Sequence, residues 1–153
     1  MSIKKVVVWG LGNPILGDDS AGLRVSEMLK RKALDWLESF TCETVPENYT
    51  SPLKRIGPSI LIIVDAADMG IPGGEYRKME LHHFSNISFT THGMPLDLIL
   101  MDCQPIIQIV AIGIQPLERT PSVDISPKVR QAITEIVDLI VRKKWNDIPS
   151  LLP

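Results

Sequence analysis

The chain has 153 residues and a formal net charge of −2 at pH 7, because 18 acidic residues slightly outnumber 16 basic ones. This length suits a single domain over residues 1–153 with a sizeable core, and the charge balance disfavours nucleic acid or a membrane surface as a partner. No apolar run approaches membrane-spanning length, and the two cysteines form no CxxC pair. With no signal-peptide pattern at the N-terminus, we expect a cytoplasmic protein. We also expect a monomer.

Residues 6–22, VVVWGLGNPILGDDSAG, join a buried strand to a turn and a helix. The β-branched and aromatic run predicts a strand over residues 5–9 that is buried on both faces, and Gly10 then permits a sharp turn. Asp18 and Asp19 precede the apolar face of the next predicted helix. The two carboxylates are therefore expected at the carboxyl end of a strand, where open α/β sheets build their sites.

Two structural alternatives compete for these carboxylates. Helix capping would explain one of them, since free N–H groups at a helix start favour a carboxylate, but it leaves the other charge unexplained. A nucleotide-phosphate site is disfavoured because Ile15 stands where the third glycine of the dinucleotide fingerprint should fall, and because two acidic residues would repel a phosphate.

The middle of the chain predicts further strands. Residues 40–45 alternate weakly, whereas residues 60–64, ILIIV, are an uninterrupted apolar run that predicts the centre of the sheet, beside the first strand. Asp65 ends this run, and a charge there is costly unless it reaches water, a partner or a metal; a loop-capping carboxylate is an equally open interpretation. Asp68 is an ordinary turn residue, and residues 75–81 follow so closely that they predict an antiparallel strand.

The three histidines lie between positions 82 and 92. His82 and His83 are adjacent, so on a strand they would point in opposite directions and we expect a solvated surface. His92 precedes Pro95, which suits a first helical turn. An imidazole near a helix N-terminus is disfavoured in its protonated form and is a good ligand, although a capping role is the more common explanation for a single histidine at such a position.

The C-terminal part predicts a buried strand over residues 106–114 and a helix that Ser126 caps and Pro127 begins. The tail from Trp145 onward is expected to fray. Alternating buried strands and helices predict a three-layer α/β/α sandwich around a mainly parallel mixed sheet of about five strands.

Asp19, Asp65 and His92 each stand where a predicted strand gives way to a loop or helix. Two carboxylates and an imidazole with open positions suit a borderline divalent ion such as nickel or zinc. The spacing leaves open whether the three side chains converge, so the residues by themselves indicate a metal site only as one interpretation.

Four segments in order resemble one known family. GLGNPILGDDSAG at residues 10–22 resembles the N-terminal signature of the [NiFe]-hydrogenase maturation endopeptidases. VDAADMG with PGGE, at residues 64–75, is similar to the second signature, THGMPL at residues 91–96 resembles the histidine segment, and GIQP at residues 113–116 resembles the late strand end. The second and third segments look closest to the branch that serves formate-hydrogenlyase-type and energy-converting hydrogenases.

This resemblance implies a specific activity. The family's enzymes, aspartic-type peptidases by convention, remove a C-terminal extension from the hydrogenase large-subunit precursor after nickel insertion. The resemblance implies that Asp19, Asp65 and His92 ligate nickel borne by that precursor, that Asp19 and Asp65 are catalytic, and that Asp18 and Asp68 support them. It implies no organic cofactor. Many members carry glutamate where this chain has Asp19, and the shorter side chain would alter the distance to the metal.

Two other functions stay open at this point. No serine, threonine or cysteine has an evident base partner, so a covalent nucleophile is not expected. Peptidyl-tRNA hydrolases also begin with a strand followed by GLGNP, but their catalytic His-Asn pair is absent here. A non-enzymatic nickel-binding assembly factor would share the three ligands and cleave nothing.

Overall fold

Strands and helices alternate along most of the chain in the computed structural model, which describes residues 5–90, 95–103, 107–118 and 123–151. The strands are β1 (Val6–Leu11), β2 (Leu37–Glu43), β3 (Ile60–Ala66), β4 (Tyr76–Met79) and β5 (Gln108–Ile114). The α-helices are α1 (Ala21–Arg31), α2 (Thr50–Ile56), α3 (Leu81–Ile87), α4 (Leu96–Ile99) and α5 (Pro127–Val141), and short 3-10 helices are η1 (Gly17–Ser20), η2 (Pro46–Tyr49) and η3 (Trp145–Asp147).

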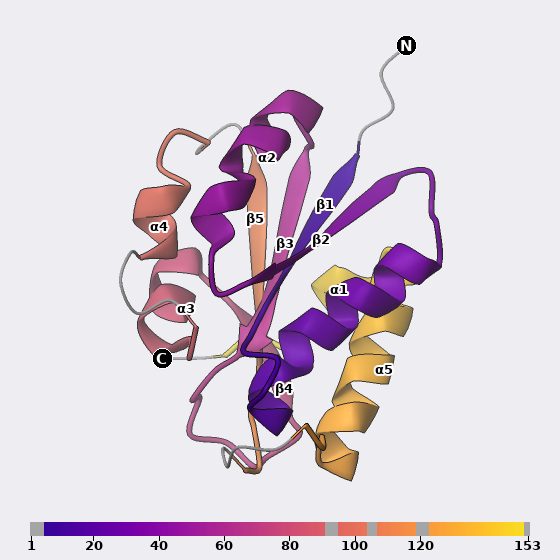
Figure 1. The fold of residues 1–153 in the computed structure, drawn as a ribbon, viewed down its shortest axis with the longest axis vertical. Coiled ribbons are helices and arrows are strands. Elements are labelled where there is room, and N and C mark those ends of the chain that lie inside the picture. Colours follow the sequence, from indigo (N-terminus) through magenta and orange to yellow (C-terminus); the bar gives the residue numbers. More distant parts are fainter. Residues whose placement is uncertain (1–4, 91–94, 104–106, 119–122, 152–153) are drawn as a thin grey trace.

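The strands form one mixed sheet in the order β2-β1-β3-β5-β4 (Figure 1). Strand β1 pairs in parallel with β2 and β3, and β3 pairs in parallel with β5. Strand β4 is antiparallel to β5, because the short link after β3 contains no crossover helix. The predicted parallel centre, the adjacent first and third strands and the antiparallel strand are all confirmed.

Helices cover both faces of the sheet, with α1 and α5 on one side and α2, α3 and α4 on the other (Figure 1). Successive side chains of each central strand point alternately toward the helices on one face of the sheet and toward those on the other. In β1, Val6 and Val8 pack with α1 and α5, whereas Val7 and Trp9 pack in the opposite core. This two-sided burial explains why the central strands are uninterrupted apolar runs, and it confirms the three-layer α/β/α sandwich.

Helix α1 lies directly against the backbone of the central strands. A Cβ on Gly22 would collide with the carbonyl oxygens of Leu11 and Val64, and a Cβ on Gly10 would collide with Ser26 of α1. Gly10, expected in a turn, is instead a residue of β1. Two glycines of the first signature therefore allow a close approach of helix and sheet, which brings the start of α1 to the carboxyl edge.

Two predicted element boundaries are wrong. The second strand runs over Leu37–Glu43, not over residues 40–45. The antiparallel strand stops at Met79 because helix α3 begins at Leu81, so His82 and His83 lie on a helix and not on a strand. The apolar residues here are too few to distinguish a period of 2 from one of 3.6, and burial of Phe84 favours the helix.

The predicted fraying of the C-terminal tail is also wrong within residues 145–151. Trp145 and Ile148 are buried, and the Trp145 ring lies 6.5 Å from that of Trp36. Lys78 of β4 donates its N–H to the Pro149 carbonyl, and the N–H of Leu151 donates to the Lys78 carbonyl. The tail therefore covers part of the outer edge of β4, which no sequence periodicity signals.

Among the described helices, none is long and apolar enough to cross a membrane.

Candidate active site

Asp65 is the most deeply buried carboxyl group at the carboxyl edge of the sheet. It is the sixth residue of β3 and has 0% of its surface exposed. Its Oδ1 accepts the N–H of Ala66 at 2.8 Å, and its Oδ2 accepts the hydroxyl of Ser88 at 2.5 Å. These donors replace the water that the carboxyl group loses in the fold.

Burial raises the pKa of Asp65 from 3.8 to about 7, because desolvation disfavours the charged form. Hydrogen bonds from Ser88, Thr90 and Ala66 lower the pKa, and the charge of Asp19 raises it further. A carboxyl group with this pKa exists in both protonation states near neutral pH. It is therefore suited to accept or release a proton in a reaction.

Asp19 lies on η1, at the start of the α1 layer, and is 3% exposed. Its N–H donates to the Leu16 carbonyl at 2.7 Å, and its carbonyl accepts the N–H of Asn13 at 3.2 Å. The charge of Asp19 contributes to the raised pKa of Asp65, so the two carboxyl groups are close enough to interact electrostatically. Both residues follow or end a central strand at the carboxyl edge of the sheet, Asp19 after β1 and Asp65 in β3.

Asp18, the neighbour of Asp19 on η1, is only 2% exposed. Its Oδ2 accepts the N–H groups of Leu117 and Glu118 at 2.9 and 3.0 Å. The N–H of Ser126 donates to Oδ1 at 2.7 Å, and the hydroxyl of Ser126 donates to Oδ2 at 2.8 Å. The capping interpretation of Asp18 is therefore wrong. Ser126 is the N-cap residue of α5 and Pro127 begins the helix, as predicted, but the Ser126 side chain makes no capping hydrogen bond and donates to Asp18 instead. The carboxylate accepts hydrogen bonds from a loop that lies about a hundred residues further along the sequence.

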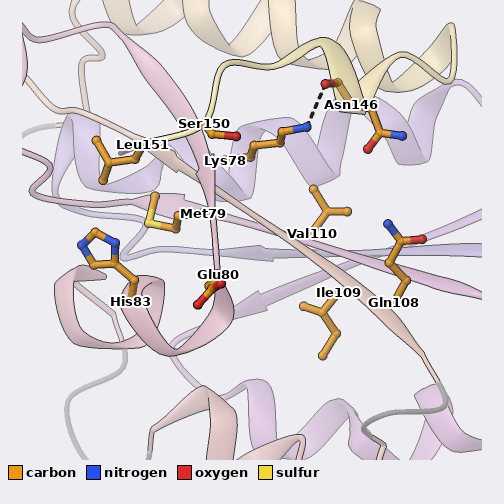
Figure 2. Close-up of a pocket in the computed structure, with 10 residues that line it drawn as sticks. All are labelled: Lys78, Met79, Glu80, His83, Gln108, Ile109, Val110, Asn146, Ser150 and Leu151. Atoms are coloured by element: carbon orange, nitrogen blue, oxygen red, sulfur yellow. Dashed lines mark hydrogen bonds between the residues drawn. The ribbon is translucent and has the colours of Figure 1, made fainter. Parts of the chain in front are cut away.

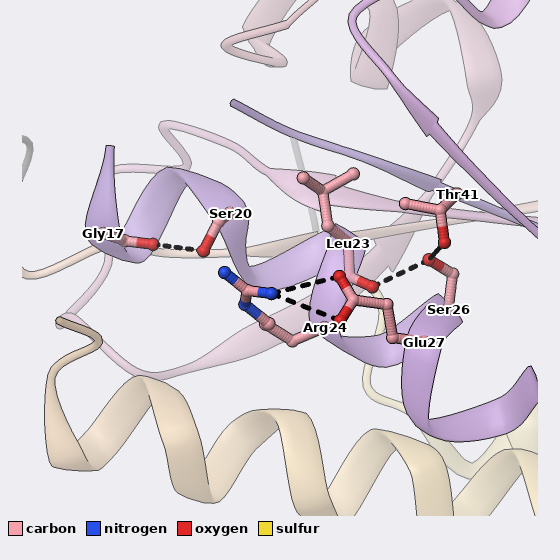
Figure 3. A network of polar contacts seen from close by, with 7 residues as sticks. All are labelled: Gly17, Ser20, Leu23, Arg24, Ser26, Glu27 and Thr41. Carbon is pink, nitrogen blue, oxygen red and sulfur yellow. Dashed lines mark hydrogen bonds and ion pairs between the residues drawn. The ribbon is translucent and has the colours of Figure 1, made fainter. Parts of the chain in front are cut away.

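Hydrogen bonds within η1 and α1, and one between α1 and β2, follow Asp19 in the chain (Figure 3). The hydroxyl of Ser20 donates to the Gly17 carbonyl at 2.6 Å and closes η1. Ser26 donates to the Leu23 carbonyl at 2.8 Å and lies 3.0 Å from the hydroxyl of Thr41 in β2. These bonds fix the helix that follows Asp19 against the sheet.

Asp68 is exposed, and its Oδ1 accepts the N–H of Gly70 at 3.3 Å, which is the turn role predicted for it. In the same loop the N–H of Met69 donates to the side-chain oxygen of Gln115 at 2.7 Å. Gln115 follows β5 in the GIQP segment, so this bond joins the second and fourth signatures at one edge of the sheet.

His92 lies outside the described residues, which stop at Thr90 and resume at Pro95, the N-cap of α4. Within the described ranges, no three histidine, cysteine, aspartate or glutamate side chains form a group that could hold a metal ion. His82 is exposed and contacts Asp97 at 3.2 Å. Of the predicted ligands, the described part of the chain thus places Asp19 and Asp65 at the carboxyl edge of the sheet, and His82 lies on α3.

A recess of about 810 Å³ lies beside the amino-terminal half of β5 and the end of β4 (Figure 2). His83, Glu80 and Lys78 contribute to its lining, and the Lys78 ammonium donates to the Asn146 carbonyl at 2.8 Å. None of the predicted site residues lines it. A smaller recess of about 330 Å³ is lined in part by Gly17, Asp18, Glu118 and Ser126.

Sequence reasoning missed the residues that surround the two aspartates. Ser88 and Thr90 donate to Asp65, and Ser126 donates to Asp18. The only available signal for the first two was that three of the four residues directly before His92 carry a hydroxyl group. Ser126 gave no such signal, because the tertiary fold alone brings it to Asp18.

Comparisons with known proteins agree with this geometry. The family model described as hydrogenase maturation protease, HycI, matches residues 23–143. A putative hydrogenase maturation protease of Methanocaldococcus jannaschii is 34% identical over 123 residues, 74% of this chain and 73% of the relative. The hydrogenase 3 maturation protease of Escherichia coli K12 is 32% identical over 108 residues, 69% of each chain.

A solved structure extends the likeness to the fold. The crystal structure of a hydrogenase 3 maturation protease matches with a TM-score of 0.85 at 24% identity, and the match covers 98% of each chain. At this identity the structural match concerns the fold, whereas the family model and the curated relatives carry the assignment. The chain is thus a peptidase that belongs to the hydrogenase maturation protease family.

Proposed function

We propose that this protein removes the C-terminal extension of a [NiFe]-hydrogenase large-subunit precursor, and that it recognises nickel already bound in that precursor. The observation that carries the proposal is the pair of buried carboxyl groups, Asp19 and Asp65, at the carboxyl edge of the sheet. Two acidic groups held near each other out of solvent are unfavourable by themselves. A cation brought by the substrate would relieve that cost.

The proposed ligands are Asp19, Asp65 and His92. Because a metal ligand must be deprotonated, nickel binding would release the proton that burial keeps on Asp65 for part of the time near pH 7. Three protein ligands leave positions open for groups of the precursor. We therefore expect the enzyme alone to hold divalent ions weakly, and the nickel belongs to the substrate and not to a resident cofactor.

The chemistry needs no covalent nucleophile. The precursor's nickel is a Lewis acid that can polarise the scissile carbonyl or a water molecule. Asp19 and Asp65 would both serve as carboxylate ligands of that nickel. A carboxylate oxygen of this pair that the metal leaves free would accept the proton of the attacking water.

The test compares nickel-loaded and nickel-free precursor as substrates for purified wild-type protein and its Asp65→Ala and His92→Ala variants. We expect cleavage of the loaded precursor only, and near-complete loss in both variants with unchanged circular dichroism. Asp19→Glu should retain part of the activity because the carboxylate is kept. Asp138→Ala, a change at an exposed carboxylate of α5, is the matched control. Equal cleavage of both precursors, or full activity in His92→Ala, would contradict the proposal.

A further inference from the structure

We propose that Asp18 is a positioning residue for the proteolytic site: it ties the turn that carries Asp19 to both ends of the connection between β5 and α5. The inference rests on the proposed function and adds a residue that touches neither nickel nor the scissile bond. It concerns the buried carboxylate that meets four donors from distant parts of the chain.

The hydrogen bonds hold two separate points of the connection. Leu117 and Glu118 follow β5 closely, and their N–H groups share one oxygen of Asp18 at 2.9 and 3.0 Å. Ser126 directly precedes α5, and it supplies both its N–H and its hydroxyl, at 2.7 and 2.8 Å. One side chain therefore determines where the connection leaves the sheet and where it enters the helix.

Hydrogen bonds to a carboxylate are stronger than those between neutral groups, which makes this anchor effective. An asparagine at position 18 would keep the shape and offer only one acceptor oxygen. Its NH₂ group would then face an N–H donor that the native oxygen satisfies. A neutral side chain of the same size thus tests the anchor without opening a cavity.

The turn that Asp18 anchors also determines the place of Asp19. The two residues are consecutive in η1, and Asp19 is held on its other side by backbone bonds to Leu16 and Asn13. If the side-chain bonds of Asp18 are lost, η1 loses its connection to Leu117, Glu118 and Ser126 and keeps its local bonds, such as that from Ser20 to Gly17. The Asp19 carboxylate would then sample positions farther from Asp65, and recognition of the metal in the precursor would weaken.

The anchor further orients an exposed apolar side chain. Leu117 is 48% exposed although its N–H is bound to Asp18. A Cβ on Gly73 would collide with the Leu117 side chain, so the glycine of the second signature makes room for it. The bond to Asp18 thus fixes the backbone of a residue whose apolar side chain is exposed.

The experiment measures backbone amide exchange and precursor processing in Asp18→Asn, Ser126→Ala and Val137→Ala. The last variant removes methyl groups from the core face of α5, and it controls for a general loss of stability. Asp18→Asn should speed exchange at the amides of Leu117, Glu118 and Ser126 by roughly tenfold or more, and lower kcat/KM on nickel-loaded precursor by a similar factor, mainly through KM. Ser126→Ala should show a smaller change in the same direction, and Val137→Ala should leave kcat/KM within about twofold of wild type.

Unchanged exchange at these amides in Asp18→Asn, or a loss of kcat/KM no larger than in Val137→Ala, would overturn the inference. If Asp18→Asn does not fold, Ser126→Ala decides, because it removes one donor and leaves the carboxylate in place. Failure of the wild-type protein to process the precursor would overturn the proposed function and the role of Asp18 with it. If the wild-type protein processes the precursor and Asp18→Asn does so with an unchanged kcat/KM, only the positioning role of Asp18 is overturned.

Discussion

Replacing Asp65 by asparagine should make the protein more stable at alkaline pH while removing its activity. The native carboxyl group is fully buried and must lose its proton there as the pH rises. Asparagine has nearly the same shape, its side-chain oxygen can still accept the N–H of Ala66, and its NH₂ group can donate to the Ser88 hydroxyl. The substitution thus removes a titration and largely keeps the packing.

The size of the effect follows from the raised pKa. Between pH 3.8, the ordinary value, and about pH 7, the folded protein keeps a proton on Asp65 that the unfolded chain has lost. The stability that this proton contributes is therefore fully present below the ordinary pKa and disappears as the pH rises through the folded-state value. At about 1.4 kcal/mol per pKa unit, loss of the Asp65 proton lowers the free energy of unfolding of the wild-type protein by about 4 kcal/mol above pH 7.

Urea unfolding of wild type and Asp65→Asn at pH 5 and pH 8 gives the decisive comparison. Any pH-independent cost of the amide cancels between the two pH values, and so do the other titrating groups that both proteins share. The free energy of unfolding of Asp65→Asn minus that of wild type should therefore be about 3 kcal/mol larger at pH 8 than at pH 5. Asp138→Asn controls for the change in net charge. A shift below about 1 kcal/mol, or a shift in favour of wild type, would refute this reasoning.

Three further substitutions test the packing and the choice of histidine. Gly22→Ala should lower the free energy of unfolding by roughly 3 kcal/mol or more, because its Cβ would collide with two strand carbonyls. Thermal unfolding measures this loss, and a value under about 1 kcal/mol would contradict the close helix–sheet contact. Ile148→Ala should cost about 2–4 kcal/mol in urea unfolding, since the side chain is 1% exposed, whereas a frayed tail would give almost no change. The double change His82→Ala and His83→Ala should leave precursor processing within about twofold of wild type, because the exposed contact to Asp97 is worth less than about 1 kcal/mol; a tenfold loss would place a histidine of α3 in the mechanism.

The fold was largely predictable because the strongest sequence signals are also the most deeply buried elements. The run at residues 60–64 predicted the central position of β3, since a strand with apolar residues on both faces needs a layer on each side. Weaker signals failed at the periphery. The segment around His82 has too few apolar residues to define a period, and the tail at Trp145 is ordered by contacts with Trp36 and β4 that are distant in sequence.

The sequence by itself determined the α/β class, the carboxyl-edge positions of Asp19 and Asp65, and the family, because local periodicity and ordered motifs are properties of contiguous residues. Only the tertiary structure decided what the carboxyl groups do. Asp65 acquires a pKa of about 7 from burial and from Asp19, which belongs to a different strand–helix unit. Asp18 changes from an apparent helix cap to an anchor because the ends of the β5–α5 connection fold back onto it. Solvation and hydrogen bonding depend on which residues meet in space, and for these two aspartates the partners lie far along the chain.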